Sequence, residues 1–460
     1  MQGGETDDLE ADMQTIPLHG SPEVSEGISL TFEDKQDEAR FAHMLRMLQW
    51  CMVIYSATTA ITKCSSNYTA HPSNLDAVLL SADILTVDVS SCFFVMCGFV
   101  ATYVYSSVGC EVWATMRLRV MAQQFGNMWL STVFILFFGV IDKIVKNRLH
   151  VEDVGLTILE GVTGLRVFDA RQSVDAPHTF NVALWPVQSL AWSLLSVHGT
   201  YHTNELLRGK FGDVANYVIL GLSLCGITLF TVFGMLHSET NVFYANATSV
   251  MYRMLEFNLG IHYFYLTERR YTLVESLTRI MAQCSPLVYA LFMITWWSEI
   301  GVAPGTRNTA VCLRLYPRNN CLHDHHAFLL RGCALGLTLL SAVSPSGFKG
   351  SIKDEITRTQ VCAVAVALCW PAYIATELIF IITFSEALVF ENTALMSIFM
   401  LIFLHAGSFV YAVGLQSKLT DHVEEFVKIV LSAVRRAKAG LVASCASVPM
   451  EPEPSFTPPN

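Results

Sequence analysis

Long apolar runs, separated by short polar loops, constrain this chain more than any other feature of its sequence. Each run is roughly 18–25 residues long, and a helix of about 20 apolar residues crosses the hydrocarbon core of a bilayer. A helix also satisfies its own backbone polar groups there. Of the 460 residues, 52% are hydrophobic and only 15% are charged, which excludes an ordinary soluble enzyme. We therefore predict an all-α, polytopic membrane helical bundle.

The apolar runs give about ten spanning segments. They are residues 45–62, 86–107, 122–142, 182–201, 214–236, 250–266, 279–299, 326–346, 360–384 and 394–416. An even number of spans places both termini on the same side of the membrane. The transmembrane domain is thus predicted to cover residues 41–416.

The segments that flank this domain are polar. Residues 1–40 are acidic and poor in aromatics, which is typical of a disordered tail. Residues 417–440 repeat apolar side chains at helical spacing and predict a cytosolic amphipathic helix. Such a helix could rest on an anionic leaflet, or it could pack on cytosolic loops. Residues 441–460 are rich in proline and are predicted to be a second disordered tail.

Three features predict that both termini lie in the cytosol, in an endomembrane or the plasma membrane. Basic loops such as "RLR" and "RGK" then fall inside, as the positive-inside rule requires. The glycosylation sequons at Asn67 and Asn246 fall outside. Cys312 and Cys321 flank a further outside loop, where oxidation to a disulfide is allowed.

Two charged residues lie within the predicted span 250–266. Arg253 and Glu256 are three residues apart and can pair on one face of the helix. Gly260 lies one turn further on and would allow a neighbouring helix to approach that face. Charge inside a membrane is costly unless it faces protein or a wet cavity. We predict that the pair lines the wall of an internal cavity.

Other ionisable residues lie at span ends that are predicted to be cytosolic. Arg46, Arg119, His198 and His202 could together form a basic entrance for an anionic, phosphate-bearing cofactor. They could equally be positive-inside anchors that bind no ligand. The cluster "HDHH" at 323–326 is interpreted as a polar turn rather than a metal site. We predict no metal and no nucleic-acid partner.

Five short apolar segments follow one another along the chain: "LRMLQWCMVIYSA" (45–57), "FFVMCGFVATY" (93–103), "RLRVMAQQFGNMWLSTVFILF" (117–137), "FNVALW" (180–185) and "RMLEFNLG" (253–260). In this order they resemble the acyltransferase 3 family of membrane acyltransferases. The resemblance extends over about residues 41–435.

The resemblance implies transfer of an acyl group from cytosolic acyl-CoA, usually acetyl-CoA, to a glycan or lipid acceptor across the membrane. In that family an Arg on the first helix contacts the cofactor side, and a His eleven residues later acts as base or acyl relay. Arg46 matches the Arg, but Ala57 stands at the position of the His.

The missing imidazole leaves two functional hypotheses. In the first, Arg46 and Arg119 hold acyl-CoA and either His405 or His262 replaces the base. In the second, the same fold serves a non-enzymatic transporter, lipid binder or scaffold in contact with membrane lipid.

Overall fold

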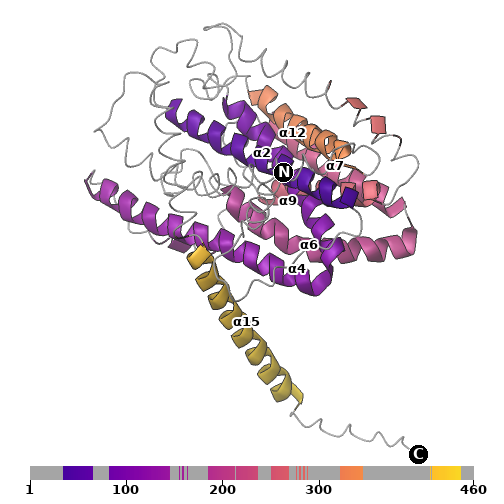
Figure 1. Cartoon of the computed structure of the whole chain (residues 1–460). Helices are drawn as coiled ribbons and strands as arrows, with labels where there is room; N and C mark the ends of the chain where they lie inside the picture. The colour runs from indigo at the N-terminus through magenta and orange to yellow at the C-terminus, as the bar shows by residue number, and fades with distance from the viewer. Residues whose placement is uncertain are drawn as a thin grey trace, which may run out of the picture.

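The computed structural model describes residues 35–65, 82–145, 185–212, 214–236, 250–268, 322–344 and 417–446, with a few isolated positions besides. Within these ranges the chain is helical and contains no strand, which confirms the all-α prediction for the described part. The helices are α2 (Lys35–Ser65), α4 (Ala82–Val145), α6 (Trp185–Phe211), α7 (Val214–Leu236), α9 (Val250–Glu268), α12 (Leu322–Ala342) and α15 (Ser417–Ala446), as drawn in Figure 1.

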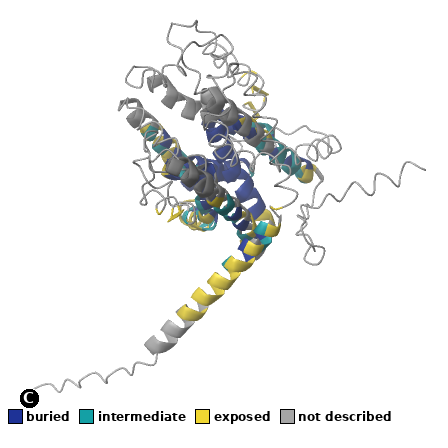
Figure 2. Ribbon diagram, turned by 90° about the vertical axis from the view of Figure 1, so that its left-hand side faces the viewer, coloured by how far each residue is buried: buried dark blue, intermediate teal, exposed yellow. Residues whose placement is uncertain are grey.

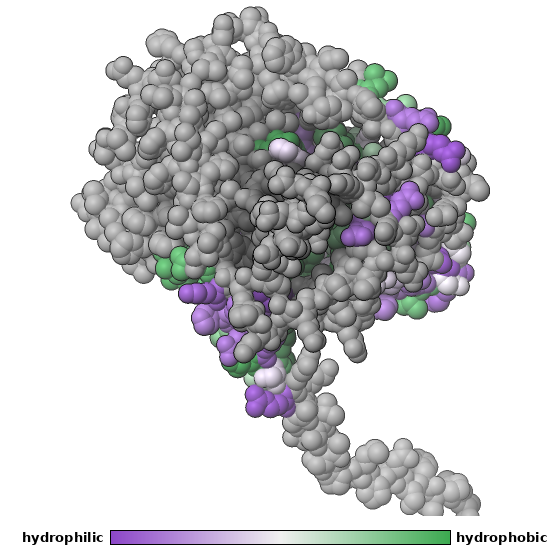
Figure 3. All heavy atoms as spheres, viewed as in Figure 1, coloured by the Kyte–Doolittle hydropathy of each residue, from purple (hydrophilic) through white to green (hydrophobic). Residues whose placement is uncertain are grey.

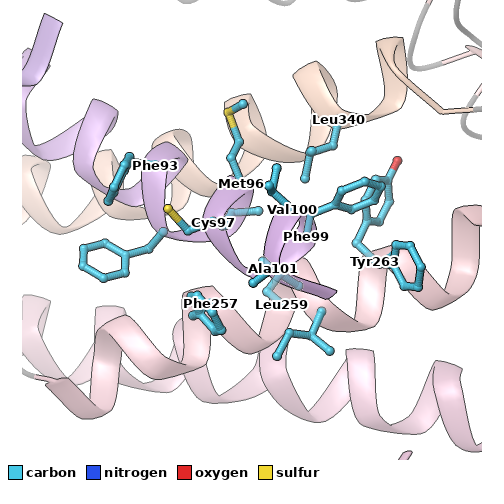
Figure 4. Close-up of a cluster of buried hydrophobic side chains, with 14 of the residues drawn as sticks. Phe93, Met96, Cys97, Phe99, Val100, Ala101, Phe257, Leu259, Tyr263 and Leu340 are labelled. Atoms are coloured by element: carbon cyan, nitrogen blue, oxygen red, sulfur yellow. The ribbon is translucent and has the colours of Figure 1, made fainter. Parts of the chain in front are cut away.

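The first part of α4 forms the centre of the bundle. Helices α2, α6, α9 and α12 all pack against α4. Figure 4 shows Met96, Cys97 and Val100 of α4 lying between Leu340 of α12 and Phe257 of α9. Because Phe94, Phe99 and Met96 are fully buried, this part of α4 contributes the largest share of the apolar core.

Glycines bring α9 and α12 into backbone contact with α4. A Cβ added at Gly260 would lie 1.9 Å from the Val95 carbonyl oxygen, and one added at Gly98 would lie 1.9 Å from that of Phe257. Helices α4 and α9 therefore cross at a point where each helix contributes a glycine that faces the backbone of the other. Small residues at helix crossings are typical of membrane bundles, where close van der Waals packing replaces the hydrophobic effect as the driving force.

On α12, Gly332 and Gly336 form a G-x-x-x-G motif. A Cβ at Gly332 would lie 2.4 Å from the Asp88 carbonyl oxygen, and one at Gly336 would lie 3.3 Å from the Cα of Cys92. The motif thus faces α4 and fixes how closely α12 approaches it.

The ten-span prediction is not confirmed. Among the described residues, one segment, Asp88–Ser107, is long and apolar enough to cross a membrane. The predicted spans 86–107 and 122–142 belong to one continuous helix, α4, because no proline interrupts residues 82–145. At about 1.5 Å per residue, its 64 residues are about three times longer than a bilayer core needs. The predicted spans 360–384 and 394–416 lie outside the described residues.

Several other boundaries differ from the prediction. Helix α2 begins at Lys35, inside the predicted N-terminal tail. Helix α6 continues past residue 201 to Phe211, and Gly212 then caps it, with a φ of 62° and an N–H that donates to the Arg208 carbonyl. Helix α7 follows from Val214, so α6 and α7 form a tight helical hairpin.

Helix α15 projects from the bundle (Figure 1). Its first turns dock on α4: Val423 is buried beside Gly126, and the ring of Phe426 lies 6.0 Å from that of Trp129. The described side chains between residues 428 and 437 are exposed (Figure 2), and they include both hydrophobic and hydrophilic residues (Figure 3). The helix begins at Ser417, the predicted start, and ends at Ala446, beyond the predicted limit of residue 440.

Candidate functional site

The start of α2 and the ends of α9 and α12 meet at one end of the bundle, which we call the convergent end. Arg40 of α2 donates to the Val343 carbonyl oxygen at 2.9 Å and pairs with Glu268 and Asp37. Burial alone would lower the pKa of Arg40, but the attraction to Glu268 and the hydrogen bonds to Glu268 and Asp37 together outweigh it, so that the pKa is raised. Arg40 therefore stays charged and ties three helices together.

Aromatic contacts extend the convergent end across the bundle. The Phe41 and Tyr103 rings stack at 5.6 Å, and Tyr103 meets Phe264 edge to face. Tyr265 continues the contact to Tyr201 of α6. The convergent end is thus built from residues near 41, 103, 201, 264 and 343. The sequence predicts that all of these segment ends lie on the same side of the membrane.

Arg46 lies at this end, next to a histidine that is not among the predicted site residues. Its Nη2 is 2.5 Å from Nδ1 of His43, one turn earlier on α2, and both side chains are partly buried. A guanidinium can only donate, so Nδ1 of His43 accepts and the imidazole proton lies on Nε2. The pair therefore presents hydrogen-bond donors and a positive charge, which suits an anion.

A second polar group at the convergent end joins α4 to α6. The Tyr105 hydroxyl lies 2.9 Å from Nδ1 of His198 and 3.4 Å from Nε2 of His202. The two imidazoles are one helical turn apart, with ring centroids 4.4 Å from each other. Tyr105 is buried, His198 is half-buried and His202 is exposed. The group is thus anchored in the bundle and open to solvent on one side.

Arg119 is placed differently from the prediction. Its guanidinium lies 3.5 Å from Asp421 and 3.8 Å from Glu424, both on α15. Arg119 therefore contributes to docking α15 on α4, and the structure shows no contact that joins it to Arg46 among the described residues. Since acidic side chains already neutralise Arg119, it is a poor partner for an anionic cofactor in this arrangement.

The Arg253–Glu256 pair is enclosed by three helices. Arg253 Nη1 donates to Glu256 Oε2 at 2.6 Å and lies 3.1 Å from the Ser91 hydroxyl of α4. Cys333 of α12 approaches the other Glu256 oxygen at 3.6 Å. The side chains of Arg253 and Glu256 are 1% and 0% exposed. The pair faces protein rather than an open cavity.

Aromatic rings complete the enclosure. The Arg253 guanidinium lies 5.4 Å from the centre of the Phe94 ring and 5.5 Å from that of Tyr252, both within cation–π range. A charged pair so surrounded has little room for a substrate. The contacts of the pair hold α9, α4 and α12 together.

His262, one of the two predicted bases, is packed inside the bundle. It is 4% exposed, and its Nδ1 lies 3.2 Å from the Asn204 amide nitrogen of α6. A general base must reach the proton that it abstracts, and this position offers no open path to one. The contact suits a hydrogen bond that holds α6 to α9.

The remaining predicted site residues lie outside the described residues. They are the second predicted base, His405, the two sequons at Asn67 and Asn246, and the cysteines Cys312 and Cys321.

Two signals in the sequence could have found what was missed. His43 and Arg46 are three residues apart on a predicted helix, a spacing at which side chains meet. Gly332 and Gly336 form G-x-x-x-G within an apolar stretch, a known sign of close helix packing. The sharing of Tyr105 by His198 and His202 had no such signal, because the tyrosine comes from another helix.

No protein-family model matches the chain, and neither does any curated protein or solved structure. The resemblance to the acyltransferase 3 family therefore stays a prediction.

Proposed function

We propose that this chain is a multi-pass membrane protein that binds acyl-CoA at the convergent end and transfers its acyl group to a glycan or lipid acceptor. The observation that carries the proposal is the contact between Arg46 and His43 at the same end as the His198–Tyr105–His202 group. Together they supply a binding pair for an anion and an imidazole within reach of solvent.

The proposal places the bundle in a membrane with the convergent end in the cytosol, where acyl-CoA is found. Support comes from the apolar segment Asp88–Ser107 and from the glycine-mediated crossings of α9 and α12 on α4. The basic residues Arg208 and Lys210 end α6 near the same face, as the positive-inside rule favours.

Arg46 would bind the phosphates of CoA, because a guanidinium pairs with phosphate oxygens through charge-assisted hydrogen bonds. His43 would donate its Nε2–H to the same anion. While it accepts from Arg46, His43 has no free lone pair and so does not serve as the base.

The base is then His202 of α6, which is exposed and lies beside Tyr105. In the proposed step, the imidazole takes the proton of the acceptor hydroxyl as its oxygen attacks the thioester carbonyl. The bond to sulfur breaks, and the CoA thiolate leaves with the proton from the imidazolium. The products are an ester and free CoA, so atoms and charge balance.

The test is transfer of radiolabelled acetate from acetyl-CoA by the full chain, purified in detergent and supplied with lipid and sugar acceptors. Arg46→Ala should raise the KM for acetyl-CoA by about tenfold or more, since it removes a charge-assisted contact. His202→Asn should lower kcat by about 100-fold while binding persists. Arg119→Ala is the matched control and should leave both constants unchanged. Absence of turnover together with binding that ignores Arg46 would refute the proposal.

A non-enzymatic binder on the same fold is the second candidate. It is favoured by Ala57 at the position of the family His and by the closed packing of His262 and Arg253. The same experiment separates the two candidates, since a binder holds acyl-CoA in an Arg46-dependent way and releases no free CoA.

A further inference from the structure

Three buried sulfur atoms form a triangle between α2 and α4. The distances from Cys51 Sγ to Cys92 Sγ, from Cys51 Sγ to Met96 Sδ and from Cys92 Sγ to Met96 Sδ are each 3.8 Å. Cys92 and Met96 are one turn apart on α4, so both side chains reach the same side and meet Cys51 of α2. Cys92 and Met96 are fully buried, and Cys51 nearly so.

The size of the triangle matches a coordination sphere. In an equilateral triangle with sides of 3.8 Å, the centre lies 3.8/√3, or about 2.2 Å, from each corner, and metal–thiolate bonds are about 2.3 Å long. An ion in the plane of the three sulfurs would therefore need almost no rearrangement of α2 or α4. A preformed set of ligands costs little ordering entropy on binding.

The ligand chemistry selects the ion. Two cysteines and a methionine are soft donors, which favour Cu(I) over hard cations such as Mg²⁺ or Ca²⁺. Three ligands in a plane differ from the four tetrahedral ligands of a structural zinc site. Among the described residues, no group of three or more His, Cys, Asp or Glu side chains is placed to hold a metal, so the thioether of Met96 is needed to complete the set.

We propose that Cys51, Cys92 and Met96 bind one Cu(I) ion in a trigonal, all-sulfur site inside the bundle. Each thiol releases its proton to the buffer on binding, and the two thiolates and the thioether each form one bond to the ion. The oxidation state of copper does not change. Because the ligands come from two helices, the bound ion also ties α2 to α4, which stabilises the folded state by the free energy of binding.

The test is an anaerobic Cu(I) titration of the full chain in detergent, under reducing conditions, against the chelator bicinchoninate. The wild type should retain one equivalent. Cys92→Ser should weaken retention by about tenfold or more, since even outer-shell changes cost metal sites 10–100-fold in affinity. Cys97→Ser, which alters a buried thiol on the same helix outside the triangle, is the matched control and should retain copper as the wild type does.

Met96→Leu supplies a readout that misfolding would not mimic, since leucine conserves the volume and packs well in cores. X-ray absorption of the copper-loaded wild type should show three sulfurs at about 2.2–2.3 Å, and Met96→Leu should show two. Equal retention by Cys92→Ser and the wild type would overturn the proposal, as would three sulfurs in Met96→Leu. The proposal would also be overturned if Cys97→Ser lost copper while Cys92→Ser retained it.

Discussion

Replacing Glu256 with alanine should destabilise the bundle strongly. The substitution removes the carboxylate that pairs with Arg253. The guanidinium stays buried at 1% exposure and keeps its contacts with the Ser91 hydroxyl and two aromatic rings. Breaking a buried ion pair by removing one partner costs about 3–5 kcal/mol, because the remaining charge is left without compensation. Each kcal/mol shifts Tm by about 2–4 °C in a domain of 150–250 residues and by less in a larger one such as this, so the apparent midpoint should fall by about 5 °C or more.

The assay is the fraction of monodisperse protein that remains after heating in detergent, followed by size-exclusion chromatography. Arg119→Ala is the comparison, because Arg119 is also paired but its side chain is 48% exposed, and exposed pairs contribute about 0–1 kcal/mol. The double variant Arg253→Met/Glu256→Leu should recover most of the loss, since apolar replacements of a buried pair are often neutral or stabilising. The reasoning is refuted if Glu256→Ala melts no lower than Arg119→Ala.

Two further predictions concern packing. Gly260→Ala should lower stability by about 3 kcal/mol or more, because the new Cβ meets backbone rather than a movable side chain. Gly221→Ala, in open space on α7, should be neutral or slightly stabilising. Equal losses of stability in the two variants, measured in the heating assay, would contradict the close crossing of α4 and α9. Arg119→Glu should repel Asp421 and Glu424 and loosen α15 by about 1 kcal/mol. Faster amide hydrogen exchange in the first turns of α15 would show that the helix has loosened. Unchanged exchange would contradict the inference that Arg119 helps to dock α15 on α4.

Helix type was predictable because it depends on local properties. The 3.6-residue spacing after residue 417 gave the start of α15, and the apolar runs placed α7, α9 and α12 to within a few residues. Helix ends were less predictable. The sequence predicts a loop around Arg117 and Arg119 because charge is costly in a bilayer, yet residues 108–121 contain no proline, and α4 continues through them.

Contacts between helices were less accessible still. The spacing of Arg253 and Glu256 indicates a pair, but only the packing of α4 and α12 shows that the pair is sealed. The sequence favours His262 as a base because an imidazole within a span is a functional candidate. The structure instead gives it Asn204 as a partner from α6, 58 residues away in the chain. Arg119 likewise meets α15 through a contact that spans 302 residues.

The central claim is that this bundle spans a membrane with its convergent end in the cytosol, and glycan mapping tests it most directly. The chain would be expressed in a eukaryotic secretory pathway and compared by gel shift after endoglycosidase treatment. Asn67→Gln and Asn246→Gln should each remove one glycan. A sequon built at the end of α6 by Gly209→Asn with Phe211→Thr should stay unmodified. A glycan at the new sequon, with none at Asn67 or Asn246, would contradict the account.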